Sequence, residues 1–207
     1  MMSDFKVRLG LDGAWLPTST TSSVTVVSEP LLTNKDLELL PRDGNRYELI
    51  EGQLYVSIVP ELEHQRTLGD LLFSFMCYLN SNPIGEVVAT PGVILSDYDG
   101  VIPDLVYLSN ERREEIATGT RIYGAPNLVI EILSPGVQNM ERDRKVKLKL
   151  YDKYGVDEYW IVDTRARAIE VYRREDKKLK FFTTFVADED ITTPLLPGFT
   201  CAVGSLF

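Results

Sequence analysis

The chain has 207 residues, is 44% hydrophobic and 26% charged, and carries a formal net charge of −9 with an isoelectric point near 4.7. These values exclude a disordered protein, predict one compact domain or a domain with a tail, and count against a simple nucleic-acid binder, which usually carries bulk positive charge. No apolar run reaches the roughly 18–20 residues of a membrane-spanning helix and no export signal opens the chain, so we expect a cytoplasmic protein without membrane contact.

The first half of the chain begins with a Ser- and Thr-rich stretch, residues 1–29, which we interpret as a weakly ordered extension or an added strand. The compact domain is expected over residues 30–207. A β-hairpin is predicted over residues 46–59, with its turn at Glu51-Gly52. Apolar residues at helical spacing then predict a long amphipathic helix. The residues of this stripe are Leu68, Leu71, Leu72, Phe75, Met76 and Leu79.

The second half of the chain is rich in β-type runs. They lie near residues 86–90, 92–96, 103–108, 127–133, 158–163, 168–174 and 178–185. The run at 127–133 is almost continuously apolar, which is typical of a central strand covered on both faces. A second helix is expected over residues 141–154. This order of elements predicts an α/β (α+β) domain with a mixed central β-sheet and flanking helices.

Two acids in these strands are candidates for a functional site. Asp104 follows Pro103 at the start of a strand, where an aspartate is commonly a turn or cap residue. Glu131 lies between Ile130 and Ile132 in the strand expected to be buried on both faces, and a buried charge is costly unless it is paired. Glu131 is therefore either the partner of an Arg or Lys in a salt bridge, or a metal ligand or general base.

A candidate cation lies on the helix that follows. Asp143, Lys147 and Tyr151 are spaced by four residues and share one helix face. Lys147 can therefore reach over the end of the strand that holds Glu131. The plain alternative is a surface Asp–Lys pair, which contributes little to stability.

Two further candidates come from the first half of the chain. Glu48 and Glu51 lie on opposite faces of one strand, so at most one of them faces a site. His64, the only histidine, shares the apolar face of the long helix. It is either a structural histidine or a group for proton transfer or phosphate contact at the start of that helix.

Other chemistries lack their residues in this chain. The sequence contains no Walker-type loop, no GxGxxG fingerprint and no GxSxG elbow, and one histidine with two cysteines does not suit a zinc site. An aspartate, a glutamate and a lysine near a sheet remain. Two carboxylates and a backbone carbonyl suit a hard divalent ion such as Mg²⁺.

Several motifs, taken in chain order, resemble one known family. They are Tyr47-Glu48-Leu49-Ile50-Glu51-Gly52, His64, Pro103-Asp104-Leu105-Val106, Val129-Ile130-Glu131-Ile132-Leu133-Ser134-Pro135, Asp143-x3-Lys147-x3-Tyr151 and Gly155-Val156-x-Glu158-Tyr159-Trp160-Ile161-Val162-Asp163. From about residue 33 to the C-terminus the chain is similar to the Uma-type "putative restriction endonuclease" family. This family is especially abundant in cyanobacteria and belongs to the PD-(D/E)xK nuclease superfamily.

The resemblance implies a restriction-endonuclease-like core in which Asp104 and Glu131 bind a metal ion and a lysine serves the attacking water. The usual strand lysine is absent, because Leu133 stands at that position. The resemblance implies that the lysine has moved to the following helix, where Lys147 fills its place. Four further residues are then expected to support the site. They are Glu48, His64, Asp143 and Tyr151.

We therefore expect a DNA endonuclease that hydrolyses phosphodiester bonds with Mg²⁺ or Mn²⁺, with DNA and the metal as partners and a homodimer as its form. One alternative is a catalytically weak or inactive nuclease-fold module that binds nucleic acid or protein. Another is a metal-dependent hydrolase with a different substrate. The charge is uneven, because residues 142–180 carry +5 and the rest −14. The basic segment is either a lip beside an acidic cleft or a solvated helix face.

Overall fold

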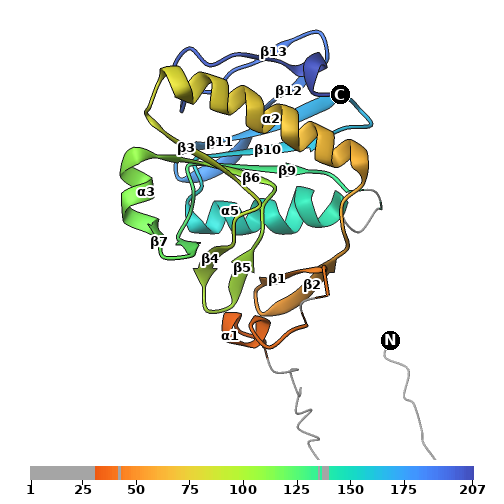
Figure 1. Ribbon diagram of the computed structural model, residues 1–207, viewed down its shortest axis with the longest axis vertical. Coiled ribbons are helices and arrows are strands. Elements are labelled where there is room, and N and C mark those ends of the chain that lie inside the picture. Colours follow the sequence, from red (N-terminus) through yellow and green to blue (C-terminus); the bar gives the residue numbers. More distant parts are fainter. Residues whose placement is uncertain (1–30, 42, 135, 137–139) are drawn as a thin grey trace, which may run out of the picture. The chain divides into compact units, whose positions relative to one another are not determined.

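A mixed six-stranded sheet forms the centre of the fold (Figure 1). The structure is a computed structural model and describes residues 31–41, 43–134, 136 and 140–207; the predicted extension, residues 1–29, lies outside the described residues. The strand order of the central sheet is β12-β11-β10-β9-β6-β3. The strands are β3 (Gly85–Ala89), β6 (Leu105–Ser109), β9 (Leu128–Ile132), β10 (Glu158–Asp163), β11 (Ala168–Glu175) and β12 (Lys178–Val186).

The pairing within this sheet confirms the predicted mixed architecture. β9 and β10 run parallel, whereas the other neighbouring pairs are antiparallel. All five residues of β9 are buried. This agrees with the continuous apolar pattern of a strand that is covered on both faces.

A second six-stranded sheet, which the sequence did not predict, has the order β2-β1-β5-β4-β8-β7. Its strands are β1 (Arg46–Ile50), β2 (Gln53–Ser57), β4 (Val93–Ser96), β5 (Asp99–Val101), β7 (Ala117–Thr118) and β8 (Arg121–Tyr123). Strands of two or three residues are too short to show a period in sequence. The predicted hairpin is present as β1 and β2, and Glu51 and Gly52 have φ values of +53° and +74°. Both turn residues are therefore left-handed, which matches the twist of a tight hairpin.

Two helices cover opposite faces of the central sheet, α2 (Leu62–Ser81) on one side and α5 (Leu148–Tyr154) on the other (Figure 1). The predicted stripe of α2 is largely correct, because Leu68, Leu71 and Phe75 are buried against the sheet. Met76 was wrongly included, since 56% of it is exposed. It directly follows Phe75 and so points in a different direction around the helix.

The remaining elements are short. They are α1 (Asn34–Leu37), α3 (Asn110–Ile116), β13 (Asp190–Ile191), β14 (Cys201–Ala202) and a 3₁₀ turn, η2 (Val203–Leu206). Residues of β13, β14 and η2 pack with α2 and the central sheet in one apolar core. Within the described part of the chain, no helix combines the length and the apolar character needed to cross a membrane.

The helix that follows β9 differs from the single α-helix predicted over residues 141–154. A π-helical turn, η1 (Arg142–Lys147), comes first, and the α-helix α5 begins only at Leu148. α5 ends at Tyr154 and is followed by Gly155, whose φ of +88° is the left-handed conformation common after a helix C-terminus. Hydrogen bonds in a π-helix span five residues, so its turn is wider than that of an α-helix. Asp143 and Lys147 of this turn are both buried.

Candidate active site

A small cavity lies where β9, η1, α2 and the β1–β2 hairpin meet. Its volume is about 20 Å³, which is enough for one ion or one water molecule. Six of the seven predicted site residues line it, and the seventh, Tyr151, contacts Glu131 from behind. We call it the acidic cavity. The six are Glu48, His64, Asp104, Glu131, Asp143 and Lys147.

Glu131 is at the centre of a hydrogen-bond network. Its Oε1 accepts hydrogen bonds from Lys147 Nζ at 2.9 Å and from the Tyr151 hydroxyl at 2.6 Å. The neighbouring residues Ile130 and Ile132 pack on the opposite face of the sheet, in the core that contains α2. The alternation of side chains along β9 therefore turns Glu131 toward η1 and α5. The salt bridge predicted as one interpretation of Glu131 is present, and it lies inside the cavity.

Asp104 precedes β6 and is also buried. Its Oδ2 accepts hydrogen bonds from His64 Nε2 at 3.0 Å and from the Ile132 amide at 2.9 Å, and its Oδ1 accepts one from Arg46 Nη1 at 3.0 Å. Burial alone would raise the pKa of Asp104, but the hydrogen bond and charge of His64 outweigh it, so the pKa lies below its usual value. His64 donates through Nε2, and its buried Nδ1 has no partner among the described residues.

Glu48 and Asp143 complete the set of carboxylates. Glu48 Oε1 lies 3.1 Å from Lys147 Nζ and accepts a hydrogen bond from the Ile102 amide at 2.8 Å. Asp143 Oδ1 lies 3.9 Å from the same Nζ. Glu51 is exposed and pairs with Lys149 outside the cavity. Only one of the two hairpin glutamates therefore lines the cavity, as their opposite faces predict.

The four carboxylates of the acidic cavity outnumber its three fixed cations. Burial raises the pKa of Glu131 to about 8, because the charge of Lys147 only partly offsets the cost of ionisation there. Burial likewise raises the pKa of Asp143, in spite of Lys147 and Arg142. Burial would lower the pKa of Lys147, but Glu131 and the other carboxylates reverse this effect and raise it. Lys147 therefore stays protonated.

The model of the Uma2 family, described as "Putative restriction endonuclease", matches residues 35–204. The chain belongs to the Uma2 family. A crystal structure of a putative nuclease belonging to DUF820 from Anabaena variabilis ATCC 29413 is similar at a TM-score of 0.68 and 18% sequence identity, over 85% of this chain and 97% of that one. This likeness establishes a shared nuclease-like fold. No curated protein matches the chain.

Two residues that line the acidic cavity of this Uma2 chain were not among the site residues predicted from the sequence. Arg46 lies two residues before Glu48 on β1 and therefore shares its face, a signal that the sequence contained. Arg142 directly precedes Asp143, and adjacent positions on a helix diverge, so no spacing rule indicated it. Its Nε donates to Asp143 Oδ1 at 3.2 Å, and its Nη1 donates to the Ser57 hydroxyl at 3.0 Å. Both arginines balance part of the carboxylate charge.

The donor set of the Uma2 cavity fits one hard divalent ion. Carboxylate oxygens are the ligands that Mg²⁺ and Mn²⁺ prefer, and the cavity volume suits a single ion. The residues that the structure describes contain no ready-made group of three His, Cys, Asp or Glu side chains placed for a metal. In place of a metal ion, Asp104, Glu131 and Glu48 form ion pairs and hydrogen bonds with cations and N–H groups of the chain. A carboxylate oxygen has two lone pairs, so these hydrogen bonds leave acceptor capacity for an ion.

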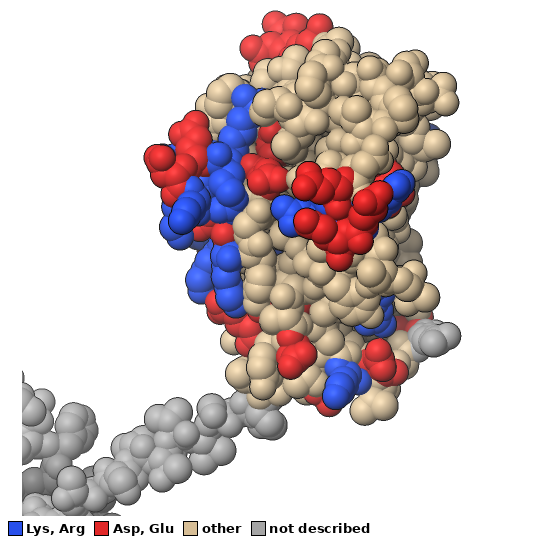
Figure 2. Space-filling model, turned by 90° about the vertical axis from the view of Figure 1, so that its left-hand side faces the viewer, with Lys and Arg blue, Asp and Glu red and all other residues tan. Residues whose placement is uncertain are grey.

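The basic segment of this Uma2 chain, residues 142–180, is mostly paired within the molecule. Its ion pairs include Arg144 with Asp163 and Glu170, Lys149 with Glu51, Lys153 with Asp99, and Arg174 and Lys178 with Asp152. Figure 2 shows acidic and basic side chains interleaved on one face of the molecule. Local carboxylates therefore offset much of the positive charge that the sequence suggested for a basic lip.

Proposed function

We propose that the protein is a metal-dependent DNA endonuclease that hydrolyses phosphodiester bonds. The observation that carries the proposal is the convergence of Asp104, Glu131 and Lys147 on one cavity large enough for a single ion. Asp104 directly precedes β6, Glu131 lies on β9 and Lys147 lies on η1. Membership of a restriction endonuclease family and a nuclease-like fold support the same class of reaction.

Asp104 and Glu131 would hold Mg²⁺ or Mn²⁺ in this proposal. A divalent ion bound there would polarise the scissile phosphate and lower the pKa of the attacking water. Asp104 is already a carboxylate near neutral pH, because its hydrogen bonds lower its pKa. Glu131, with a pKa of about 8, would release a proton when an ion binds. Metal affinity should therefore rise with pH.

Lys147 would act as a fixed positive charge. Its raised pKa favours the protonated ammonium, which supports a role in orienting the attacking water over a role as general base. Nζ can orient the attacking water and stabilise the negative charge that develops on the phosphate. Glu48, whose Oε1 lies 3.1 Å from Nζ, is then the carboxylate placed to hold the same water and take its proton.

Arg46 and His64 would contact the phosphate. Both lie at the cavity and hydrogen bond to Asp104, and the Arg46 side chain is 24% exposed, so it can meet a ligand at the rim. Arg142 and Asp143 would keep Lys147 in place through the ion pairs around the π-helical turn. Tyr151 would fix the orientation of Glu131.

One observation favours a second function, a nuclease-fold module that does not cut. The carboxylates are satisfied by cations within the chain, and Leu133 replaces the usual strand lysine. Calorimetric titration with Mn²⁺ separates the two proposals. Binding at micromolar to millimolar concentrations supports the endonuclease, whereas no binding in that range favours the inactive module.

Cleavage of supercoiled plasmid and of branched DNA, with Mg²⁺ or Mn²⁺ and with EDTA, tests the proposed activity. Asp104→Asn and Lys147→Met should each lower the rate by ~10²-fold or more. The matched controls are Asp97→Asn and Lys153→Met, which change an exposed acid and an exposed lysine outside the cavity. Equal rates for the cavity variants and the wild type would refute the assignment.

We also propose that the protein self-associates, because two identical sites related by a twofold axis can cut the two strands of a duplex. Light scattering of the full chain at micromolar concentrations tests this. A mass of 23.4 kDa, that of one chain, at every concentration would exclude a dimer.

A further inference from the structure

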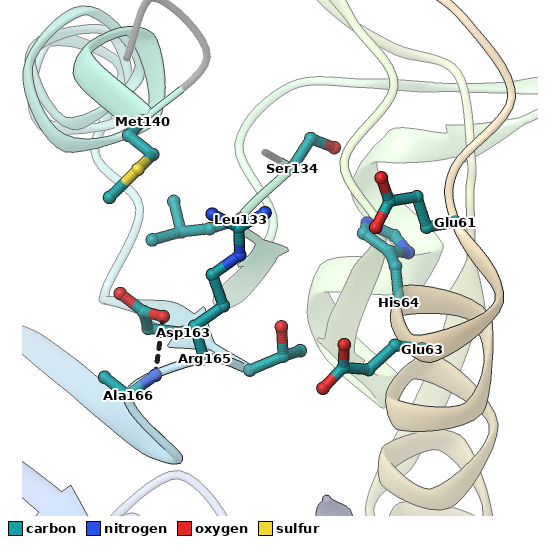
Figure 3. A pocket seen from close by; sticks show the side chains of 10 residues that line it. Glu61, Glu63, His64, Leu133, Ser134, Met140, Asp163, Arg165 and Ala166 are labelled. Atoms are coloured by element: carbon teal, nitrogen blue, oxygen red, sulfur yellow. Dashed lines mark hydrogen bonds between the residues drawn. The ribbon is translucent and has the colours of Figure 1, made fainter. Parts of the chain in front are cut away.

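A second, larger cavity adjoins the acidic cavity and shares His64 and Ser134 with it. Its volume is about 310 Å³, and we call it the side pocket. Figure 3 shows α2 on one side of it, with Glu61 and Glu63, and the turn after β10 on the other side, with Arg165. A ligand in the side pocket would therefore lie one side chain away from the proposed reaction centre.

Three charged side chains at the side pocket lack an ion-pair partner among the described residues. Neither Glu61 nor Glu63 makes an ion pair or a side-chain hydrogen bond with any described residue, and the same holds for Arg165. Figure 3 shows the side chain of Arg165 extending from its turn toward Leu133 and Ser134, while the two glutamates approach from α2. Asp163, by contrast, is held by Arg144 and by the Ala166 amide. Across the side pocket, the exposed guanidinium of Arg165 thus faces two exposed carboxylates, none of which has an ion-pair partner in the described part of the chain.

This arrangement disfavours a phosphate group, since two carboxylates against one guanidinium leave net negative charge. It favours a neutral, planar ligand that offers acceptors on one edge and donors on another. The apolar side chains of Leu133 and Met140 also line the pocket and can contact the flat face of such a ligand. A volume at the small end of ligand pockets suits one such group rather than several.

Guanine has the best-matched edges among the nucleobases. Its O6 and N7 accept hydrogen bonds, and an arginine fork binds this pair in the commonest specific contact to DNA. Its ring N–H and amino group, on the base-pairing edge, can donate to a carboxylate. Cytosine and adenine have an amino group, but neither combines it with a ring N–H donor as guanine does. Thymine has no amino group and matches least well.

We propose that the side pocket binds an unpaired guanine next to the scissile phosphate, with Arg165 and Glu63 reading its edges. The inference rests on the proposed function and names the class of substrate. A base that is paired in a duplex uses the edge that Glu63 would contact, and it is stacked inside the helix. The preferred substrate is therefore DNA with an unpaired nucleotide at the cleavage point, as in single strands, branches and frayed ends.

Binding to single-stranded DNA tests the pocket without requiring cleavage. The probes are fluorescent 12-nucleotide oligo-dT strands with one central guanine, thymine or abasic site, titrated with the full chain in EDTA and in Ca²⁺. We expect the guanine strand to bind at least about tenfold more tightly than the other two, in the range of one base contact. Equal affinity for all three strands would overturn the proposal.

Variants of the side pocket test whether the guanine preference arises there. Arg165→Ala and Glu63→Ala should reduce the guanine preference to less than about twofold, a ratio in which any general electrostatic effect on all strands cancels. Arg113→Ala, at a half-buried position of α3 outside both cavities, and Glu114→Ala, at an exposed position of the same helix, are the controls and should keep the preference. If Arg165→Ala weakens all strands equally, the guanidinium contacts phosphate and the proposal fails. Circular dichroism of each variant checks that it is folded.

The outcome for the pocket is separable from that for the enzyme. A guanine preference without cleavage in Mg²⁺ or Mn²⁺ supports the pocket and refutes the endonuclease. Cleavage without any base preference supports the endonuclease and refutes the pocket. Absence of binding to every strand in both EDTA and Ca²⁺ refutes the pocket, whatever the cleavage assay shows.

Discussion

Glu131 in the acidic cavity and Asp99 at the start of β5 are both buried acids, yet the protein shifts their pKa values in opposite directions. Glu131 is 4% exposed and has a pKa raised to about 8. Asp99 is 1% exposed and has a lowered pKa. Each accepts hydrogen bonds from one lysine and one tyrosine of the same helical segment, Lys147 and Tyr151 for Glu131 and Lys153 and Tyr154 for Asp99.

The difference lies in what else surrounds the two acids. Burial opposes ionisation of Asp99, but the Glu51 amide, the Tyr154 hydroxyl and the Ser96 hydroxyl outweigh it by donating to the carboxylate. Glu131 instead shares its lysine with other carboxylates that also repel its negative charge. Asp99 has more donors and a half-exposed lysine partner, whereas Glu131 and its lysine are both enclosed, so the number of donors and the cost of burial together decide the direction of each pKa shift.

Removal of the lysines should give the largest contrast between the two regions. Lys147→Met should destabilise the protein by about 3–5 kcal/mol, because it leaves several buried carboxylates without their shared cation. Lys153→Met should cost less than about 1 kcal/mol, since this side chain is 48% exposed. Urea unfolding measures both. A Glu131→Gln/Lys147→Met double variant should recover part of the stability that Lys147→Met loses. Equal losses of stability for Lys147→Met and Lys153→Met would contradict the comparison.

The pH dependence of stability should also differ. The folded protein holds a proton on Glu131 more tightly than the unfolded chain, whose Glu pKa is about 4.3. This contribution to stability is complete below that value and is lost as pH rises through about 8. Relative to Glu131→Gln, the wild type in EDTA should lose stability from pH 6 to pH 8, by at most about 1.4 kcal/mol per pH unit.

The contribution of Asp99 to stability should depend on pH in the opposite direction. Its pKa is lowered in the folded state, so its contribution is present above the unfolded value of about 3.9 and is lost as pH falls through the lower folded value. At pH 7, Asp99→Asn should cost about 2 kcal/mol, because the Glu51 amide and two hydroxyls lose a charged acceptor. The wild type and this variant should converge below pH 4. Asp97→Asn, at an exposed site, should change stability by less than about 0.5 kcal/mol.

Removal of the two tyrosine hydroxyls should give the smallest difference in stability between the two regions, in the most closely matched pair of variants. The hydroxyls of Tyr151 and Tyr154 each donate over 2.6 Å, to Glu131 and to Asp99. Tyr154→Phe should cost about 1.5 kcal/mol, the lower end for a hydrogen bond to a charged group. Tyr151→Phe should cost about 1 kcal/mol at pH 6, where Glu131 is largely protonated. A larger cost for Tyr151→Phe at that pH would show that Glu131 is ionised.

The long, strongly patterned elements of the fold were predictable from sequence. The stripe of α2, the continuous apolar run of β9 and the hairpin turn at Glu51-Gly52 each follow from a local period or turn. The second sheet was not predictable, because β5, β7 and β8 have two or three residues each, and the sheet forms only when β5 pairs with β1 and β8 pairs with β4, which are remote in sequence. The π-helical turn was also missed, since one extra residue per turn leaves no clear mark in the apolar pattern.

The candidate site was partly predictable for the same reason. Glu131 stood out as a lone acid in an apolar strand, and Lys147 stood out by its spacing from Asp143 and Tyr151. Arg46 could have been added from its position two residues before Glu48. The pairing of the basic segment was not visible in the sequence, because its partners, such as Asp99 and Glu51, lie on other elements.

The sequence by itself determined the mixed sheet, the helix that covers it and the residue types of the acidic cavity, because period and burial act on neighbours along the chain. Only the tertiary structure decided how the charges pair. It placed one lysine among several carboxylates at Glu131, gave Asp99 a full set of donors, and left Arg165 facing two glutamates across the side pocket. Electrostatic effects depend on distance and burial in space, so residues remote in sequence set the chemistry of each acid.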